Sequence, residues 1–169
     1  MMVSLSNLIR RGFEDACEQP CVSEAFQEAQ CLEPVLRGLC LADLPPLMHR
    51  RSIPSRRQDE LLEGVIRAYR RGPRVVWGPI LLAMLGPAVV RAAARLTAQP
   101  PAIEESDIDQ QVVFETLRAA ARMPLPEDCR FVQRRLMWWA IKPVVRWLER
   151  ESRRPLPNEA VKGAKEGGR

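Results

Sequence analysis

Apolar residues recur at intervals of three and four along most of the chain, which is the spacing of one face of an α-helix. This pattern predicts helices over residues 3–18, 22–43, 58–71, 75–96, 104–123 and 130–150. No stretch alternates apolar and polar residues as a half-buried strand does. The sequence therefore predicts an all-α fold.

Prolines are expected to interrupt these helices, because the ring removes a backbone N–H and clashes with the preceding turn. In the first half of the chain, breaks are predicted at Pro20, Pro34 and Pro45-Pro46. In the second half, Gly86-Pro87 is expected to bend its helix, and Pro143 predicts a kink or a restart near Ile141.

Composition and predicted structure divide the chain into four segments. Residues 1–45 form an acidic helical arm with three Arg and seven Asp or Glu, a net charge of −4, against +9 for the remainder. Residues 46–57 form a basic linker, interpreted as a solvated hinge or an arm that touches DNA. Residues 58–152 form a domain of three to four helices, and residues 153–169 are expected to be a disordered tail.

The composition favours a cytoplasmic protein without a membrane partner. No uninterrupted apolar run reaches the ~20 residues that span a bilayer, and the amino terminus lacks the apolar core of a signal peptide. The five cysteines are an odd number without tight zinc-knuckle spacing. Cys17 and Cys21 fit small apolar residues on one helix face, and a zinc site with His49 is the weaker alternative. We expect no cofactor.

The last predicted helix combines cations with indoles, which suits a polyanion whose bases can stack on aromatic rings. Trp138 and Trp139 diverge by about 100° on a helix, so both cannot face one core. The alternative is that some of these indoles pack in the core, as at least one should. The candidate DNA-binding residues are Arg130, Arg134, Arg135, Trp138, Trp139, Lys142, Arg146, Trp147 and Arg150.

The helix over residues 104–123 opens with carboxylates, which the helix dipole favours. If Ile108, Val112, Val113 and Leu117 face inward, its exposed face carries Asp107, Gln110, Gln111 and Glu115. On the residues alone, an ordinary solvated helix start is the favoured interpretation of this face. No set of Ser, His and Asp partners and no Gly-rich phosphate loop accompanies it. We therefore expect the chain not to be an enzyme.

Three of these segments resemble region 2 of the sigma-70 family, especially its compact extracytoplasmic-function type. Residues 87–96 are similar to the family's first helix, and residues 107–114 to its acidic helix, with Asp109 at a position that is usually apolar. Residues 131–150 are more loosely similar, since Ile141-Lys142 stands where Arg-Asn is typical. The resemblance covers about residues 58–152.

The resemblance implies a sigma region 2-like bundle of three to four helices, preceded here by a short helical arm. It also implies that the acidic helix docks on the clamp helices of the largest subunit of the RNA polymerase core. The predicted helix over residues 130–150, with its arginines and tryptophans, would then capture single-stranded promoter DNA to support transcription initiation.

The family's region 4 reads a second promoter element. Fifteen residues follow Arg154, too few for region 4, so a separate region 4-like protein is expected to supply it. The alternative is a non-initiating protein-interaction or regulatory module, in which the acidic arm covers the basic face.

Overall fold

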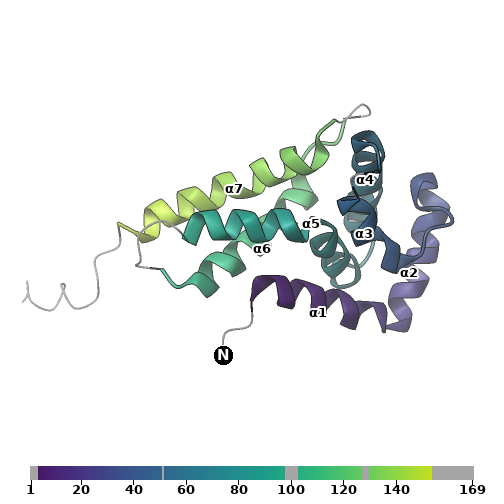
Figure 1. Cartoon of the computed structure of the whole chain (residues 1–169), viewed down its shortest axis with the longest axis horizontal. Coiled ribbons are helices and arrows are strands. Elements are labelled where there is room, and N and C mark those ends of the chain that lie inside the picture. Colours follow the sequence, from purple (N-terminus) through teal and green to yellow (C-terminus); the bar gives the residue numbers. More distant parts are fainter. Residues whose placement is uncertain (1–3, 51, 98–102, 127–129, 154–169) are drawn as a thin grey trace, which may run out of the picture.

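The computed structural model describes residues 4–50, 52–97, 103–126 and 130–153. Within these residues the protein is all-α, which confirms the predicted fold class. The helices are arranged around one long central helix (Figure 1). They are α1 (Leu5–Cys17), α2 (Pro20–Leu32), α3 (Leu44–His49), α4 (Ser55–Arg71), α5 (Arg74–Thr97), α6 (Glu105–Arg122) and α7 (Val132–Glu151), with 3-10 turns at Pro34–Leu36 and Leu41–Asp43.

The central helix α5 contacts α1, α3, α4, α6 and α7. It is long and apolar enough to cross a membrane by length and composition, but 56% of its most apolar window is buried inside the protein. A buried core helix of this kind passes the same test, so the result is weak evidence for a membrane span. The fully buried residues of α5 include Trp77, Ile80, Leu81, Met84 and Leu85.

Two of the predicted proline breaks are confirmed. Pro20 is the first residue of α2, and Pro34 opens a 3-10 turn after α2 has ended at Leu32. The predicted end at Pro45-Pro46 is wrong, because both prolines lie in the first turn of α3. A helix tolerates proline there, since the first N–H groups have no partner within the helix.

The other two prolines lie inside continuous helices. Helix α5 continues through Pro87 as well as Pro79. Helix α7 continues through Pro143, so the predicted restart near Ile141 is wrong.

The interpretation of residues 46–57 as a solvated hinge is wrong for the parts that are helical. Residues 46–49 belong to α3, whose Leu44 and Met48 are buried, and residues 55–57 begin α4. The predicted disordered tail lies outside the described residues, apart from Arg153.

The acidic arm packs as part of the core. Helix α1 lies along α5, and Phe26 of α2 meets Trp77 of α5 with ring centroids 6.3 Å apart. Glu33 is buried and forms ion pairs with Arg67, at 3.0 Å, and with Arg71 of α4. Arg67 also pairs with Glu63 at 3.3 Å. The arm is thus held to α4 and α5 by both apolar and charged contacts.

Helix α4 forms hydrogen bonds with the end of α6 and with the start of α7. Asp59 accepts hydrogen bonds from the first backbone N–H groups of α7. Near the other end of α4, Arg70 donates hydrogen bonds to the carbonyls of Ala120, at 2.7 Å, and of Met123. Helix ends leave such groups without partners inside the helix, so α4 fixes the end of α6 and the start of α7.

Candidate nucleic-acid interface

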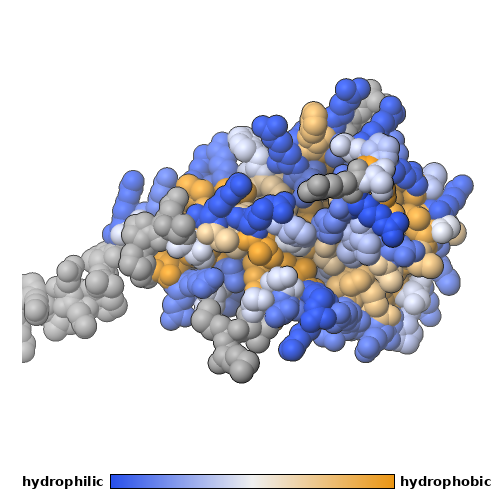
Figure 2. Space-filling model, viewed as in Figure 1, coloured by the Kyte–Doolittle hydropathy of each residue, from blue (hydrophilic) through white to orange (hydrophobic). Residues whose placement is uncertain are grey.

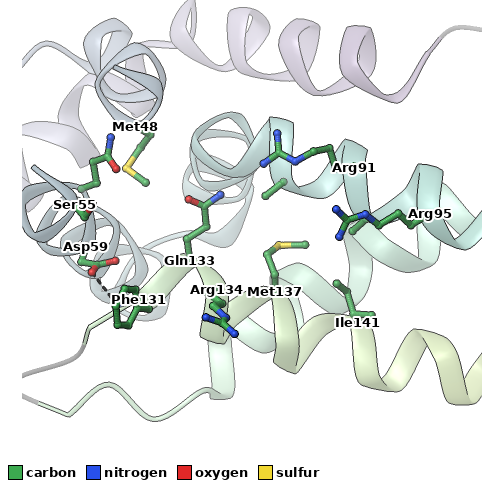
Figure 3. Close-up of a pocket in the computed structure, with 13 residues that line it drawn as sticks. Met48, Ser55, Asp59, Arg91, Arg95, Phe131, Gln133, Arg134, Met137 and Ile141 are labelled. Carbon is green, nitrogen blue, oxygen red and sulfur yellow. Dashed lines mark hydrogen bonds between the residues drawn. The ribbon is translucent and has the colours of Figure 1, made fainter. Parts of the chain in front are cut away.

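Helices α3, α4, α5 and α7 surround a cleft of about 360 Å³ (Figure 3). Arg91 and Arg95 enter its lining from α5, one helical turn apart, and Arg134 enters from α7. All three side chains belong to exposed residues. The lining of the cleft therefore includes arginines from two helices that lie far apart in the sequence, with the Arg134 side chain directed away from Arg91 and Arg95 (Figure 3).

These three arginines have no partner carboxylate among the residues that the structure describes. None of the ion pairs within the described residues includes Arg91, Arg95 or Arg134. Asp59 is the acidic residue among those that line the cleft, but its two oxygens accept from the N–H groups of Phe131 and Val132 at 2.8 and 2.9 Å. Asp59 is thus occupied as a hydrogen-bond acceptor, and the lining of the cleft carries three guanidinium charges against one carboxylate.

His49, on the neighbouring helix α3, lies close enough to the cleft for the charge of Arg91 to affect its pKa. Burial lowers the pKa of His49, a hydrogen bond with the backbone of Ala83 opposes this effect, and the charge of Arg91 lowers the pKa further by the smallest amount. The carbonyl of Ala83 cannot receive the usual helical hydrogen bond, because the residue four positions later is Pro87. His49 and Ala83 line the same pocket, beside the acceptor that the proline of α5 leaves open.

A ridge of cations and one indole continues from the cleft along α7. Arg134, Trp138, Lys142 and Arg146 follow each other at intervals of four, which places them on one side of the helix, and all are exposed. Trp138 is 61% exposed, and the Lys142 ammonium lies 5.1 Å from the centre of its ring. We call these four residues the α7 ridge.

The other candidate DNA-binding residues lie around this ridge. Trp139 is partly exposed beside it, and Arg130 and Arg150 are exposed near the two ends of α7. Arg135 is half-buried. Trp147 is partly buried against the core, so it is the indole with the packing role that the sequence left open.

The predicted exposed face of α6 is correct for some residues and wrong for Glu115. Asp107 and Gln110 are exposed and Gln111 is half-buried, whereas Glu115 is only 5% exposed and pairs with Arg118 at 3.0 Å. The buried stripe of α6 includes positions 108, 112, 115 and 119, which is a helical spacing of its own. Val113 and Leu117 are only partly buried for the same reason.

Sequence analysis missed two exposed apolar features near α6. Phe114 is 58% exposed on the outer face of the helix. An apolar groove of about 430 Å³ also lies between α1 and α6, with Leu8, Leu82 and Val113 in its lining. Figure 2 shows apolar surface where α1 lies beside α6. The groove depends on the docking of α1, which the local sequence pattern does not reveal.

Asp109 also lines this groove, at a position that the resembling family fills with an apolar residue. Burial, and secondly the neighbouring Glu105, raise the pKa of the Asp109 carboxyl. A carboxylate that is partly withdrawn from water and has a like charge beside it is less stable in its ionised form.

No arrangement of ligands for a metal ion occurs in the part of the chain that the structure describes. No group of three or more His, Cys, Asp or Glu side chains comes together there. Cys17 is half-buried, while Cys21, Cys31 and Cys40 are exposed. Cys129 lies outside the described residues.

No family model, curated protein or solved structure matches this chain. Fold and site together define an all-α protein with an arginine-lined cleft that leads onto a ridge of cations and an exposed indole.

Proposed function

We propose that the chain binds single-stranded nucleic acid across the α7 ridge, as the promoter-strand-binding domain of a sigma-like transcription factor. The observation that carries this proposal is Trp138, an exposed indole between Arg134 and Lys142 on one side of α7. An exposed ring accepts an unpaired base by stacking, and flanking cations neutralise phosphates on either side. The expected ligand is a strand with free bases, which in the cytoplasm of a bacterium includes melted promoter DNA.

The second part of the proposal concerns α6. Asp107 and Gln110 are exposed near the start of the helix, on a different element from the α7 ridge. We propose that they contact the RNA polymerase core while α7 holds the strand. A separate region 4-like protein would then supply the second promoter contact. Glu115 is left out of this surface because it is buried.

Strand binding is tested with a labelled single-stranded oligonucleotide in fluorescence anisotropy. Trp138→Ala should weaken binding by about 1–3 kcal/mol, the contribution of one stacked base. Arg134→Gln should reduce the slope of log affinity against log salt concentration by about 0.7, the value for one phosphate contact on a single strand. Phe114→Ala removes an equally exposed aromatic ring from α6 and serves as the matched control. Unchanged affinity in Trp138→Ala would remove the stacking role.

Polymerase association is tested by co-purification of the tagged protein with polymerase subunits from its own host. Gln110→Arg should abolish co-purification and Asp107→Asn should weaken it, with the thermal midpoint nearly constant. Surface substitutions of this kind change stability by about 0.5 kcal/mol or less, although Asp107 adds about 0.3–1 kcal/mol through the helix dipole. Retained co-purification in a folded Gln110→Arg protein would leave strand binding standing and remove the docking role.

The α1–α6 groove favours a second candidate function, a protein-interaction module that does not initiate transcription. Such a module would bind a partner protein without binding a free strand. The version of this alternative in which the arm covers the basic face has little support. The arm's ion pairs within the described residues run inside α1, from Arg10 to Glu14, or to α4 through Glu33.

A further inference from the structure

We infer that the cleft between α5 and α7 binds a free nucleoside triphosphate. Arg91, Arg95 and Arg134 are among the residues that line one volume of about 360 Å³, which is within the size range of small-ligand sites. A triphosphate concentrates its negative charge on adjoining phosphates, whereas a strand carries one charge per nucleotide along an extended backbone. Arg91 and Arg95, one helical turn apart on one wall of the cleft, match the concentrated charge better than the extended one.

The cleft arginines lack a competing anion from the protein itself. They form no ion pair within the described residues. Asp59 is held by the backbone of Phe131 and Val132, so it is occupied as a hydrogen-bond acceptor. A bound polyphosphate would therefore gain charge-assisted hydrogen bonds without displacing an existing salt bridge.

The same cleft contains groups that suit a nucleobase. The Phe131 side chain is 63% exposed at the cleft margin, next to the start of α7. Gln58 and Gln133 bring amide groups that can both donate and accept hydrogen bonds, and Met137 adds a polarisable apolar surface. Aromatic and amide groups of this kind recognise the faces and edges of bases. Figure 3 shows Gln133 and Met137 projecting from α7 on the side where Arg91 and Arg95 project from α5.

The inference goes beyond the proposed function, because it concerns a free nucleotide and stands without strand binding. Isothermal titration calorimetry on the full chain tests it with ATP, GTP and inorganic tripolyphosphate as separate probes. We expect saturable binding of at least one nucleotide below about 1 mM. Tripolyphosphate, which lacks base and sugar, should bind about tenfold more weakly. Equal affinity for tripolyphosphate and both nucleotides would overturn the nucleoside assignment.

The double variant Arg91→Gln/Arg95→Gln should weaken nucleotide binding about 100-fold, roughly tenfold for each charged hydrogen-bonding group removed. Arg134→Gln, from the opposite wall, should weaken it less than the double variant does, because the Arg134 side chain is directed away from Arg91 and Arg95. The double variant Arg11→Gln/Arg122→Gln removes the same charge from exposed residues outside the cleft. It should change affinity by about twofold or less at physiological salt, where distant charges are screened.

Circular dichroism confirms that each variant is folded before the titrations are compared. All four substituted residues of the two double variants are exposed, and none takes part in an ion pair within the described residues. Absence of saturable binding by both nucleotides, or an equal loss in the two double variants, would overturn the site. A protein that binds the strand and not the nucleotide would lose this inference and keep the proposed function.

Discussion

Asp59 of α4 accepts hydrogen bonds from the backbone N–H groups of Phe131 and Val132, which lie 72 and 73 residues later in the chain. A helix usually receives this cap from a side chain immediately before it. Phe131 has φ 58° and ψ 41°, in the left-handed region, and its side chain cannot cap its own helix. The carboxylate of a distant helix therefore starts the helix that carries the ridge.

Asp59→Ala should destabilise the protein by about 0.5–2 kcal/mol, the usual cost of losing an N-terminal cap. Urea unfolding followed by circular dichroism measures this change. Glu60→Ala removes the neighbouring carboxylate, which forms exposed ion pairs with Arg56 and Arg57, and should cost no more than about 1 kcal/mol. Equal losses in the two variants would argue against the cap.

Phe131→Gly should stabilise the protein by about 0.5–1 kcal/mol. The left-handed conformation costs a non-glycine residue about 1–2 kcal/mol, and the variant removes this cost. The greater conformational entropy of glycine in the unfolded chain offsets part of the gain. The matched control is Phe114→Gly, which changes a similarly exposed ring in the interior of α6. Glycine should destabilise that position by about 0.5–1 kcal/mol. Thermal melts of the two variants should thus shift in opposite directions, and shifts of the same sign would contradict the strain at Phe131.

Glu33→Gln should destabilise the protein by about 1–3 kcal/mol, since it removes a buried charge that two arginines of α4 share. Glu14→Gln, which breaks the exposed pair with Arg10, should cost about 0.5 kcal/mol or less. Both values come from chemical denaturation at neutral pH. If Glu33→Gln behaves like Glu14→Gln, the arm is held to α4 by apolar contacts alone.

Asp109→Asn should stabilise the protein at neutral pH. The raised pKa of Asp109 in the folded protein means that its favourable contribution is present below its ordinary value of 3.8 and is lost as pH rises through the folded pKa. The amide cannot ionise, so it removes this loss. The advantage of the variant should shrink as pH falls through the raised folded pKa and should be lost below the ordinary value of 3.8. Thermal midpoints measured across the acid range check the trend, and a variant advantage that grows on acidification would contradict it.

Local periodicity was sufficient to place most of the helices. The predicted gap between residues 71 and 75 correctly separated α4 from α5, and the predicted break at Pro20 correctly separated α1 from α2. Pro143 lies in the interior of α7, which continues although the proline removes one helical hydrogen bond. The error at Pro45-Pro46 has another cause, since proline is costly only where its missing N–H or its ring removes a contact that the helix would otherwise make. The first turn of α3 has no such contact to lose.

Which side of a helix faces the core was less predictable. In α6, the pattern allowed Val113 and Leu117 to face inward, but the packing partners select the stripe through positions 108, 112, 115 and 119. Glu115 therefore became buried and Phe114 exposed. The sequence of one helix does not determine which side is buried, because burial depends on the surfaces of α4, α5 and α7 against which α6 packs.

The sequence by itself determined the all-α class, the acidic character of the arm and the run of cations and indoles along α7, because each follows from residue type and spacing within one segment. Tertiary structure alone decided that Arg91 and Arg95 share a cleft with Arg134, that Asp59 caps α7, and that Glu33 joins the arm to α4. The physical reason is that charge pairing and capping act over a few ångströms in space, between residues whose separation along the chain contains no trace of their distance.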